Sequence, residues 1–441
     1  MDLEYDDFTL EVYPDGNRAY QVSASSNGDQ RSPMQVPTGL AHLAPSHSAR
    51  TGSSRDVFRE LLDNPPSSSP MDQARDLGRQ LFQAALPSPI LGLFRQRLAV
   101  ARQSGKGLRL KVSIDTRDER LRWISDLPWE LLYDPEADSF LALNTFTPIV
   151  RYRPVPSLVP PAPFSGSLHI LALTANPIDH PTLDTESECK SLEAAVEKAS
   201  AAKIRSERSA TLERLVGLLQ KQPFQVLHFM GHGTFKDGRG ALLLENDYGE
   251  GAFLPDSTLC ELVAAHPATQ LVVLNACKTA QGARGSTDFP FTGLASRLLL
   301  KGVPAVIAMR LPITDSAALS FSSHFYENLV QRRPLECCLT QARLAIHCQE
   351  PESVEWAIPA LYLNRSEGRL FQMKDELKRE TTTTQKDESS IVIHQDVDSD
   401  SGLDVVGIDG DAGSPATSRI EIGGSVKAKK TIQIVGIRRV G

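Results

Sequence analysis

One histidine and one cysteine in this sequence each follow a short apolar run. His232 lies between two glycines directly after Val226–Met230, and Cys277 lies just past Leu271–Leu274. A cysteine attacks as its thiolate, and a histidine within hydrogen-bond reach supplies the base and the positive charge that favour this form. The pair is a candidate for nucleophilic catalysis by a thiol.

Both residues need strands to bring them together. The run Leu271–Leu274 is continuous, apolar and rich in β-branched residues, which is typical of a strand buried on both faces of a parallel sheet. Ligands bind at the carboxyl ends of such strands, so His232 and Cys277 share one edge if their strands are neighbours. The backbone N–H groups of Gly233 and Cys277 are then candidate donors to an oxyanion. Spacing alone favours the alternative, a buried structural cysteine and a hydrogen-bonded histidine.

Composition narrows the class of protein. At roughly 100 to 200 residues per domain, 441 residues predict two or three domains. With 41% hydrophobic residues, 23% charged residues and a formal net charge of -7, the chain resembles ordinary soluble proteins. It has no basic stripe with interleaved aromatic residues, so we expect no direct nucleic-acid binding. No signal-peptide pattern and no run of about 18 apolar residues occurs, which predicts a cytoplasmic protein without a membrane partner. Six irregularly spaced cysteines do not indicate a disulfide framework.

The order of patterns suggests five segments. Strand and helix patterns alternate between 168 and 309, which predicts an α/β fold with a mostly parallel sheet flanked by helices. The expected segments are a β hairpin and linker (1–54), an α+β region (55–163), the α/β core (164–372), a linker (373–390) and a small β-rich tail (391–441). Within the second segment we expect a short helix at 56–62, then two helices between 71 and 104.

The tail contains a repeat. Residues 391–408 align without a gap on residues 420–437, with six identical positions, and each unit reads as strand, turn, strand. We therefore expect two tandem β hairpins. Their turns carry opposite charges: Asp396, Asp398 and Asp400 in the first, and Lys427, Lys429 and Lys430 in the second. Exposed hairpin edges can accept a strand from a partner protein, a docking mode known as β-augmentation.

Neither a metal nor a cofactor is expected. His228 and His232 are four residues apart, as in helical metal pairs, but their segment reads as a strand and a glycine turn without a third ligand. His228 is predicted to pack in the core. The acidic run 396–402 departs from a calcium loop because its twelfth position is Gly407 rather than glutamate. No phosphate-binding loop pattern occurs.

Several ordered blocks resemble those of a known family. The segments 228–233 and 274–280 closely resemble the two catalytic blocks of CHAT domains, a caspase-like bacterial protease family. The resemblance spans roughly 165 to 365 and extends more weakly back to about 70. Further blocks that resemble the family are Leu127–Tyr133 with its Pro-Trp-Glu sequence, Gly302–Ala308, Phe325-Tyr326 and Trp356–Pro359.

The resemblance implies a caspase-like sheet in which His232 is the general base and Cys277 the nucleophile of an endopeptidase that cleaves a partner protein. It also implies a regulated effector in bacterial defence or cell death, with an activating protein partner. Where relatives often have Leu-Trp, this chain has Arg310–Asp315, so the pocket there is expected to differ. Asp288 and Asp315 are candidates to line it and to select arginine or lysine. The alternative is a catalytically silent scaffold that recruits partners through its sheet and its tail.

Overall fold

The computed structural model describes residues 3–16, 19–26, 35–43, 69–155, 167–199, 201–236, 239–275, 290–365 and 368–371, and short strands between 390 and 440. The chain divides into two compact units, Met1–Phe371 and Gln372–Gly441. The helix expected at 56–62 lies outside the described residues, as do most of the two expected linkers.

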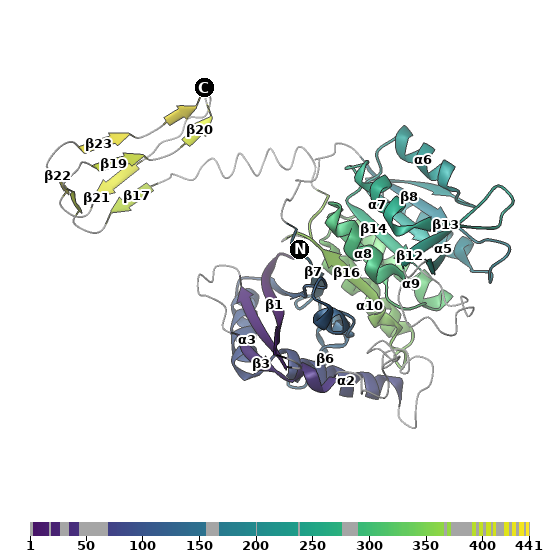
Figure 1. Ribbon diagram of the computed structural model, residues 1–441, viewed down its shortest axis with the longest axis horizontal. Coiled ribbons are helices and arrows are strands. Elements are labelled where there is room, and N and C mark those ends of the chain that lie inside the picture. The colour runs from purple at the N-terminus through teal and green to yellow at the C-terminus, as the bar shows by residue number, and fades with distance from the viewer. Residues whose placement is uncertain are drawn as a thin grey trace. The chain divides into compact units, whose positions relative to one another are not determined.

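One eleven-stranded sheet runs through the first unit in the order β3-β2-β1-β4-β7-β16-β15-β14-β10-β8-β9 (Figure 1). Its strands are β1 (Tyr5–Asp15), β2 (Ala19–Ser26), β3 (Val36–Thr38), β4 (Gly107–Ser113), β7 (Ile149–Tyr152), β8 (Leu168–Thr174), β9 (Ala202–Glu207), β10 (Val226–Met230), β14 (Leu271–Asn275), β15 (Ala305–Met309) and β16 (Pro359–Leu363). Seven of its ten neighbouring pairs are parallel. The predicted fold class, a mostly parallel sheet flanked by helices, is confirmed.

Helices cover both faces of this sheet. They are α2 (Pro70–Ala85), α3 (Ser88–Gln103), α4 (Arg122–Ser125), α5 (Thr185–Glu197), α6 (Leu212–Lys221), α7 (Asp256–Ala264), α8 (Pro290–Leu300), α9 (Asp315–Leu329) and α10 (Leu335–Gln349). Alternate residues of β14 enter different cores because successive side chains of a strand point to opposite faces. Leu271 and Val273 belong to the core under α5, α9 and α10, whereas Val272 and Leu274 belong to the core under α6, α7 and α8.

Sequence patterns located most of these elements. The N-terminal hairpin is formed by β1 and β2, and the helices expected between 71 and 104 are α2 and α3, separated at Pro87. In the α/β core, α5 ends at Glu197, and β9 follows it. A second sheet was not expected. It has the order β11-β12-β13 and consists of β11 (His232–Lys236), β12 (Arg239–Glu245) and β13 (Gly251–Pro255).

The boundaries expected near 54 and 163 fall within one sheet. Strands from the segments 1–54, 55–163 and 164–372 all pair in it, through β1 with β4 and β7 with β16. The proline-rich run at 154–163 lies mostly outside the described residues, and the strands before and after it, β7 and β8, belong to the same sheet. A proline-rich composition is therefore not sufficient to identify a domain boundary.

The tail pairs differently from the expected hairpins. Its strands are β17 (Ser390–Ile393), β18 (Val397–Ser399), β19 (Leu403–Val406), β20 (Asp409–Asp411), β21 (Arg419–Ile422), β22 (Val426–Ala428), β23 (Ile432–Val435) and β24 (Arg438–Val440). Each strand of the first repeat pairs in parallel with its counterpart in the second repeat. The hairpin prediction is therefore corrected: the strands pair between repeats, in a register that sets equivalent positions of the two repeats, such as Ile391 and Ile420, opposite each other.

Candidate functional site

Two neighbouring strands of the large sheet end together. β10 and β14 are parallel partners in a register that aligns Met230 with Asn275, and the Gly231 N–H donates to the Asn275 carbonyl at 3.3 Å. These strands are therefore neighbours, which is the condition under which His232 and Cys277 share one edge. His232 follows β10 by two residues, and Cys277 follows β14 by two residues. Cys277 itself lies outside the described residues.

The ring of His232 is buried and held by a backbone oxygen. Its side chain is 4% exposed, and its Nε2 lies 2.9 Å from the carbonyl oxygen of Pro181. A carbonyl oxygen can only accept, so Nε2 carries the hydrogen and Nδ1 of the neutral ring is free of a proton. Burial lowers the pKa of His232, and the hydrogen bond to Pro181, which raises it, does not compensate. The imidazole is therefore neutral at pH 7, the form that accepts a proton.

The loop that carries Pro181 follows β8 at the same edge of the sheet. Within this loop, Asp179 Oδ1 lies 2.9 Å from His180 Nδ1 and accepts the Gly251 N–H at 2.8 Å. The rings of His180 and His232 lie 5.7 Å apart. The loop is thereby held by β8, from which it continues, and by the hydrogen bond to β13 of the second sheet. Both restrain the position of the Pro181 carbonyl that accepts from His232.

A buried polar cluster lies under this edge, on the side of α5 and α9. The Glu188 carboxylate accepts hydrogen bonds from Asn275 Nδ2 at 2.5 Å and from the Ser322 hydroxyl at 2.9 Å. His228 is fully buried, as predicted, and its Nδ1 lies 3.1 Å from the Tyr326 hydroxyl. Burial lowers the pKa of His228 to about 3, so this ring is neutral. The cluster fixes Asn275, the last described residue before the segment that contains Cys277.

The remaining predicted site residues have different surroundings. Gly233 is half-buried in β11, one residue after His232. Asp315 is exposed in the first turn of α9, where a carboxylate also stabilises the positive end of the helix dipole. Asp288, like Cys277, lies outside the described residues. The flanking Gly231 is required for space, because a Cβ there would lie 2.9 Å from the Ala175 carbonyl oxygen.

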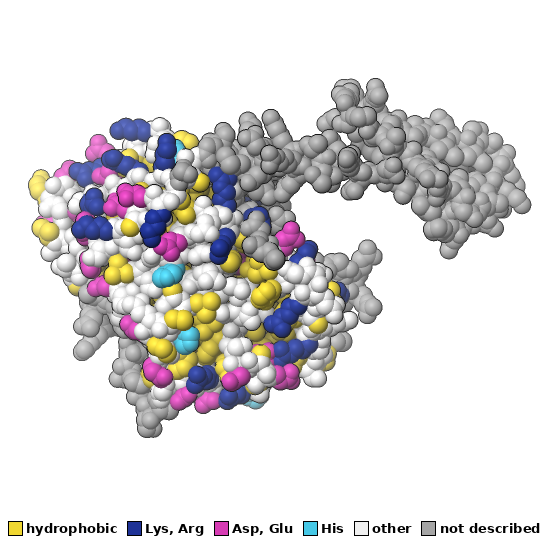
Figure 2. Space-filling model, turned by 180° about the vertical axis from the view of Figure 1, so that it is seen from behind, with side chains coloured by type: hydrophobic (Ala, Val, Ile, Leu, Met, Phe, Trp, Pro, Cys, Tyr) yellow, Lys and Arg dark blue, Asp and Glu magenta, His cyan; other side chains and the backbone are white. Residues whose placement is uncertain are grey.

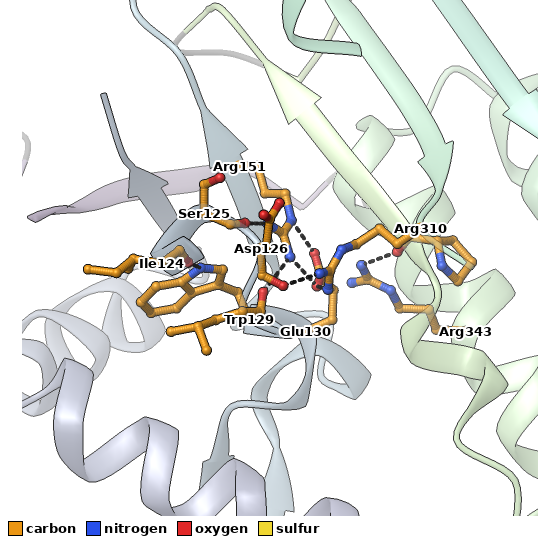
Figure 3. Close-up of polar contacts among 10 residues, drawn as sticks. Ile124, Ser125, Asp126, Trp129, Glu130, Arg151, Arg310 and Arg343 are labelled. Carbon is orange, nitrogen blue, oxygen red and sulfur yellow. Dashed lines mark hydrogen bonds and ion pairs between the residues drawn. The ribbon is translucent and has the colours of Figure 1, made fainter. Parts of the chain in front are cut away.

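The Pro-Trp-Glu block joins the N-terminal region to the end of β15. Figure 3 shows the Glu130 carboxylate between the guanidinium groups of Arg151 and Arg310. Arg151 donates to it through Nε at 2.8 Å and Nη2 at 2.7 Å, and Arg310 Nη1 lies 3.3 Å away. Burial raises the pKa of Glu130, but the charge and hydrogen bonds of Arg151, together with the charges of Arg310 and Arg343, outweigh this effect and hold the pKa at about 2. Arg310 directly follows β15, so this buried cluster anchors the chain that leads into α9.

On the face seen in Figure 2, basic and acidic side chains of the described residues are intermixed, and neither charge forms a continuous patch. Among the described residues, no group of three histidine, cysteine or carboxylate side chains is arranged to hold a metal ion. None of the helices in the described parts of the chain has the length and apolar character needed to cross a membrane.

Sequence reasoning missed the residues that position His232. Pro181 contributes a backbone oxygen, which leaves no side-chain signal, and Asp179 and His180 lie in a polar loop of ordinary composition. The one available signal was topological. This loop follows a predicted strand, so its residues are expected at the same edge as His232.

Comparisons with known proteins place this geometry in context. The family model described as CHAT domain matches residues 75–373. A search of curated proteins gave no match. Two crystal structures of the Saccharomyces cerevisiae separase-securin complex, at 2.6 and 3.0 Å resolution, align with a TM-score of 0.40 and 12% identity. The alignments cover 81% and 82% of this chain but only 30% of the matched chains.

Proposed function

The chain belongs to the CHAT domain family, and from this premise we propose that it is a cysteine endopeptidase that hydrolyses peptide bonds of a partner protein. The observation that carries the proposal is the shared end of β10 and β14, which is followed on one strand by His232 and on the other by the segment containing Cys277. The neutral His232 ring, with Nε2 occupied by the Pro181 carbonyl and Nδ1 left to accept a proton, supports the role of general base.

The proposed reaction proceeds in two stages. His232 Nδ1 takes the proton of the Cys277 thiol, and the sulfur attacks the carbonyl carbon of the scissile bond. The C–N bond breaks, the amine leaves with the proton from His232, and a thioester remains. Water then gives a proton to His232 and attacks the thioester, which releases the carboxylic acid and restores the thiol. The backbone N–H groups of Gly233 and Cys277 are the proposed donors to the oxyanion.

The proposal extends to specificity and regulation. Asp315 is exposed where α9 begins, and with Asp288 it is proposed to favour substrates with arginine or lysine before the scissile bond. A library of peptides that differ at this position tests the idea, and preferential cleavage after aspartate would contradict it. By the family resemblance we also propose a regulated effector role in bacterial defence or cell death, switched on by a protein partner.

Comparison of new protein termini tests the peptidase. Cells that express the intact chain are compared with cells that express Cys277→Ala, and termini present only with the intact chain mark substrates. Cleavage that persists in Cys277→Ala would refute the assignment. Cys348→Ala is the matched control, because Cys348 is an exposed free thiol far along the chain from the strands of the site.

A thiol-reactive peptide probe separates the peptidase from a silent scaffold. Labelling of Cys277 that is lost in His232→Ala but retained in His324→Ala, a variant of an exposed histidine, supports the enzyme. Absence of labelling at Cys277 in the intact chain with its activating partner favours the scaffold. The feature that supports a scaffold is the tail, whose two repeats carry opposite charges.

A further inference from the structure

The tail strands are paired at a constant offset. Ile391 pairs with Ile420 and Val406 pairs with Val435, which is a shift of 29 residues in both cases. All four pairs of strands are parallel. Each repeat therefore forms one layer of four short strands, and the second layer lies in register on the first.

Both layers have an open side. Among the strands that the structure describes, each tail strand belongs to a two-stranded sheet and so has a single partner. The backbone groups on its other edge are then available to a further strand. Stacked-repeat folds need about three or more repeats and polar caps at their ends to be stable and soluble. A stack of two layers falls below that number.

The two layers carry opposite charges. Residues 390–411 include six aspartates and no lysine or arginine, whereas residues 419–440 include six lysines and arginines and one glutamate. In the observed register Asp398 pairs with Lys427, and Asp409 pairs with Arg438. Opposite charges at facing positions of neighbouring strands are favourable, and like charges are unfavourable.

We propose that the open side of each layer is occupied by the tail of a second copy of this chain, with the acidic layer of one copy on the basic layer of the next. Within one chain the second repeat already pairs with a first repeat. The first repeat of an incoming copy has the same sequence, so it can pair in the same register with the other edge of that second repeat. The register within the chain is thus repeated between chains, and acidic and basic layers alternate along the stack.

The charges also determine the symmetry of the assembly. A two-fold symmetric dimer would place acidic on acidic or basic on basic layers, which repel each other. The head-to-tail arrangement joins unlike surfaces and leaves one of each exposed, so it does not close and grows into a fibre. Stacked parallel, in-register strands are the arrangement that gives such fibres their stability. The fibre would gather many copies of the unit Met1–Phe371.

The first test follows assembly of the full chain carrying Cys277→Ala, which prevents proteolysis from altering the sample. We expect sedimentation velocity and electron microscopy to show fibres above a threshold concentration. The double variant Asp398→Lys and Asp409→Lys places like charges at every layer contact and is expected to raise the threshold at least tenfold. Asp72→Lys with Asp247→Lys, at exposed positions of the first unit, changes the net charge equally and is expected to leave the threshold unchanged.

The second test exchanges the charges of the two oppositely charged pairs, Asp398 with Lys427 and Asp409 with Arg438. A chain with Asp398→Lys, Asp409→Arg, Lys427→Asp and Arg438→Asp restores alternation, so it is expected to assemble at the original threshold. Mixed with the unswapped chain under two different fluorescent labels, it is expected to form separate fibres, because every mixed junction brings like charges together. An unswapped chain that stays monomeric at all concentrations, an unchanged threshold in the double variant, or mixed fibres would each overturn the proposal.

Discussion

Replacing Glu130 by glutamine tests whether the buried cluster around it stabilises the first unit through its charge. Glutamine keeps the size of the side chain and an oxygen acceptor but removes the negative charge between Arg151 and Arg310. Glu130 is 1% exposed, so water cannot enter to screen the two arginine charges once the carboxylate is removed. Loss of one partner from a buried ion pair typically lowers the free energy of unfolding by about 3 to 5 kcal/mol, because the remaining charge stays buried.

The pKa of Glu130 leads to a similar magnitude. The folded-state value of about 2 lies below the ordinary value of 4.5, and a shift of this size corresponds to about 3 kcal/mol. A group whose pKa is lowered by folding stabilises the protein above its unfolded pKa and loses that effect as the pH falls toward its folded pKa. The difference between the original chain and Glu130→Gln is therefore expected to be full above about pH 5 and to shrink below about pH 4.5.

Urea titration followed by the fluorescence of the three tryptophans, of which Trp129 is buried beside Glu130, measures this difference. The matched control is Glu136→Gln. The Glu136 side chain is 76% exposed and lies 3.4 Å from Arg95, so its loss is expected to change the free energy of unfolding by less than about 1 kcal/mol. Equal effects of the two variants, or a Glu130→Gln effect that does not change between pH 6 and pH 4, would refute the reasoning.

Three further predictions concern the candidate site. Burial lowers the pKa of His232, so the acidic limb of the kcat/KM profile of the proposed peptidase is expected below pH 6.5; a limb above that value would assign the base to another group. Gly231→Ala is expected to lower stability by about 1 to 3 kcal/mol through overpacking, whereas Gly217→Ala, at an open position of α6, is expected to raise it by up to about 1 kcal/mol in the same thermal-unfolding assay. Asn275→Ala removes a hydrogen bond to the buried Glu188 carboxylate and is expected to cost about 1 to 3 kcal/mol in urea titration; no change would show that the carboxylate does not depend on this donor.

The parts of the fold predicted from sequence are those in which the residues themselves decide the structure. The apolar, β-branched run at β14 and the apolar run at β10 are typical of strands buried on both faces, so their type was predictable, whereas their pairing with each other was not. Those two strands also gave the location of His232. The resemblance to CHAT domains then supported the pairing of His232 with Cys277, which spacing alone did not favour.

Other features depend on contacts that no local pattern reveals. β9 lies at the end of the sheet and contains Lys203, Arg205 and Glu207. Because it has no apolar run of its own, its sequence cannot be distinguished from the end of the helix before it. β11 begins with His232-Gly233 and lacks an apolar run. In the tail, the repeat established which positions are equivalent, but equivalence does not say whether strands pair within a repeat or between repeats.

A reversal of strand direction between β15 and β16 creates a junction that the N-terminal region contacts. β8, β10, β14 and β15 are parallel to one another, and β16 is antiparallel to β15 but parallel to β7. The end of β15 thus meets the start of β16, where the Arg310 N–H donates to the Ile358 carbonyl at 3.1 Å and Arg343 Nη2 donates to the Pro359 carbonyl at 2.7 Å. Glu130, from the N-terminal region, lies against the same junction.

The segment 164–372 is therefore expected not to fold when it is produced alone, although it contains His232 and Cys277. A chain that begins at residue 164 lacks β7, which covers one edge of β16. It also lacks Glu130, which offsets the charge of the fully buried Arg310. A bare apolar strand edge promotes aggregation, and a buried arginine that loses a carboxylate partner is strongly destabilising. Soluble yield and circular dichroism of 164–372 compared with 1–372 measure the effect. A soluble, cooperatively unfolding 164–372 would show that the N-terminal strands are an addition to a self-sufficient core.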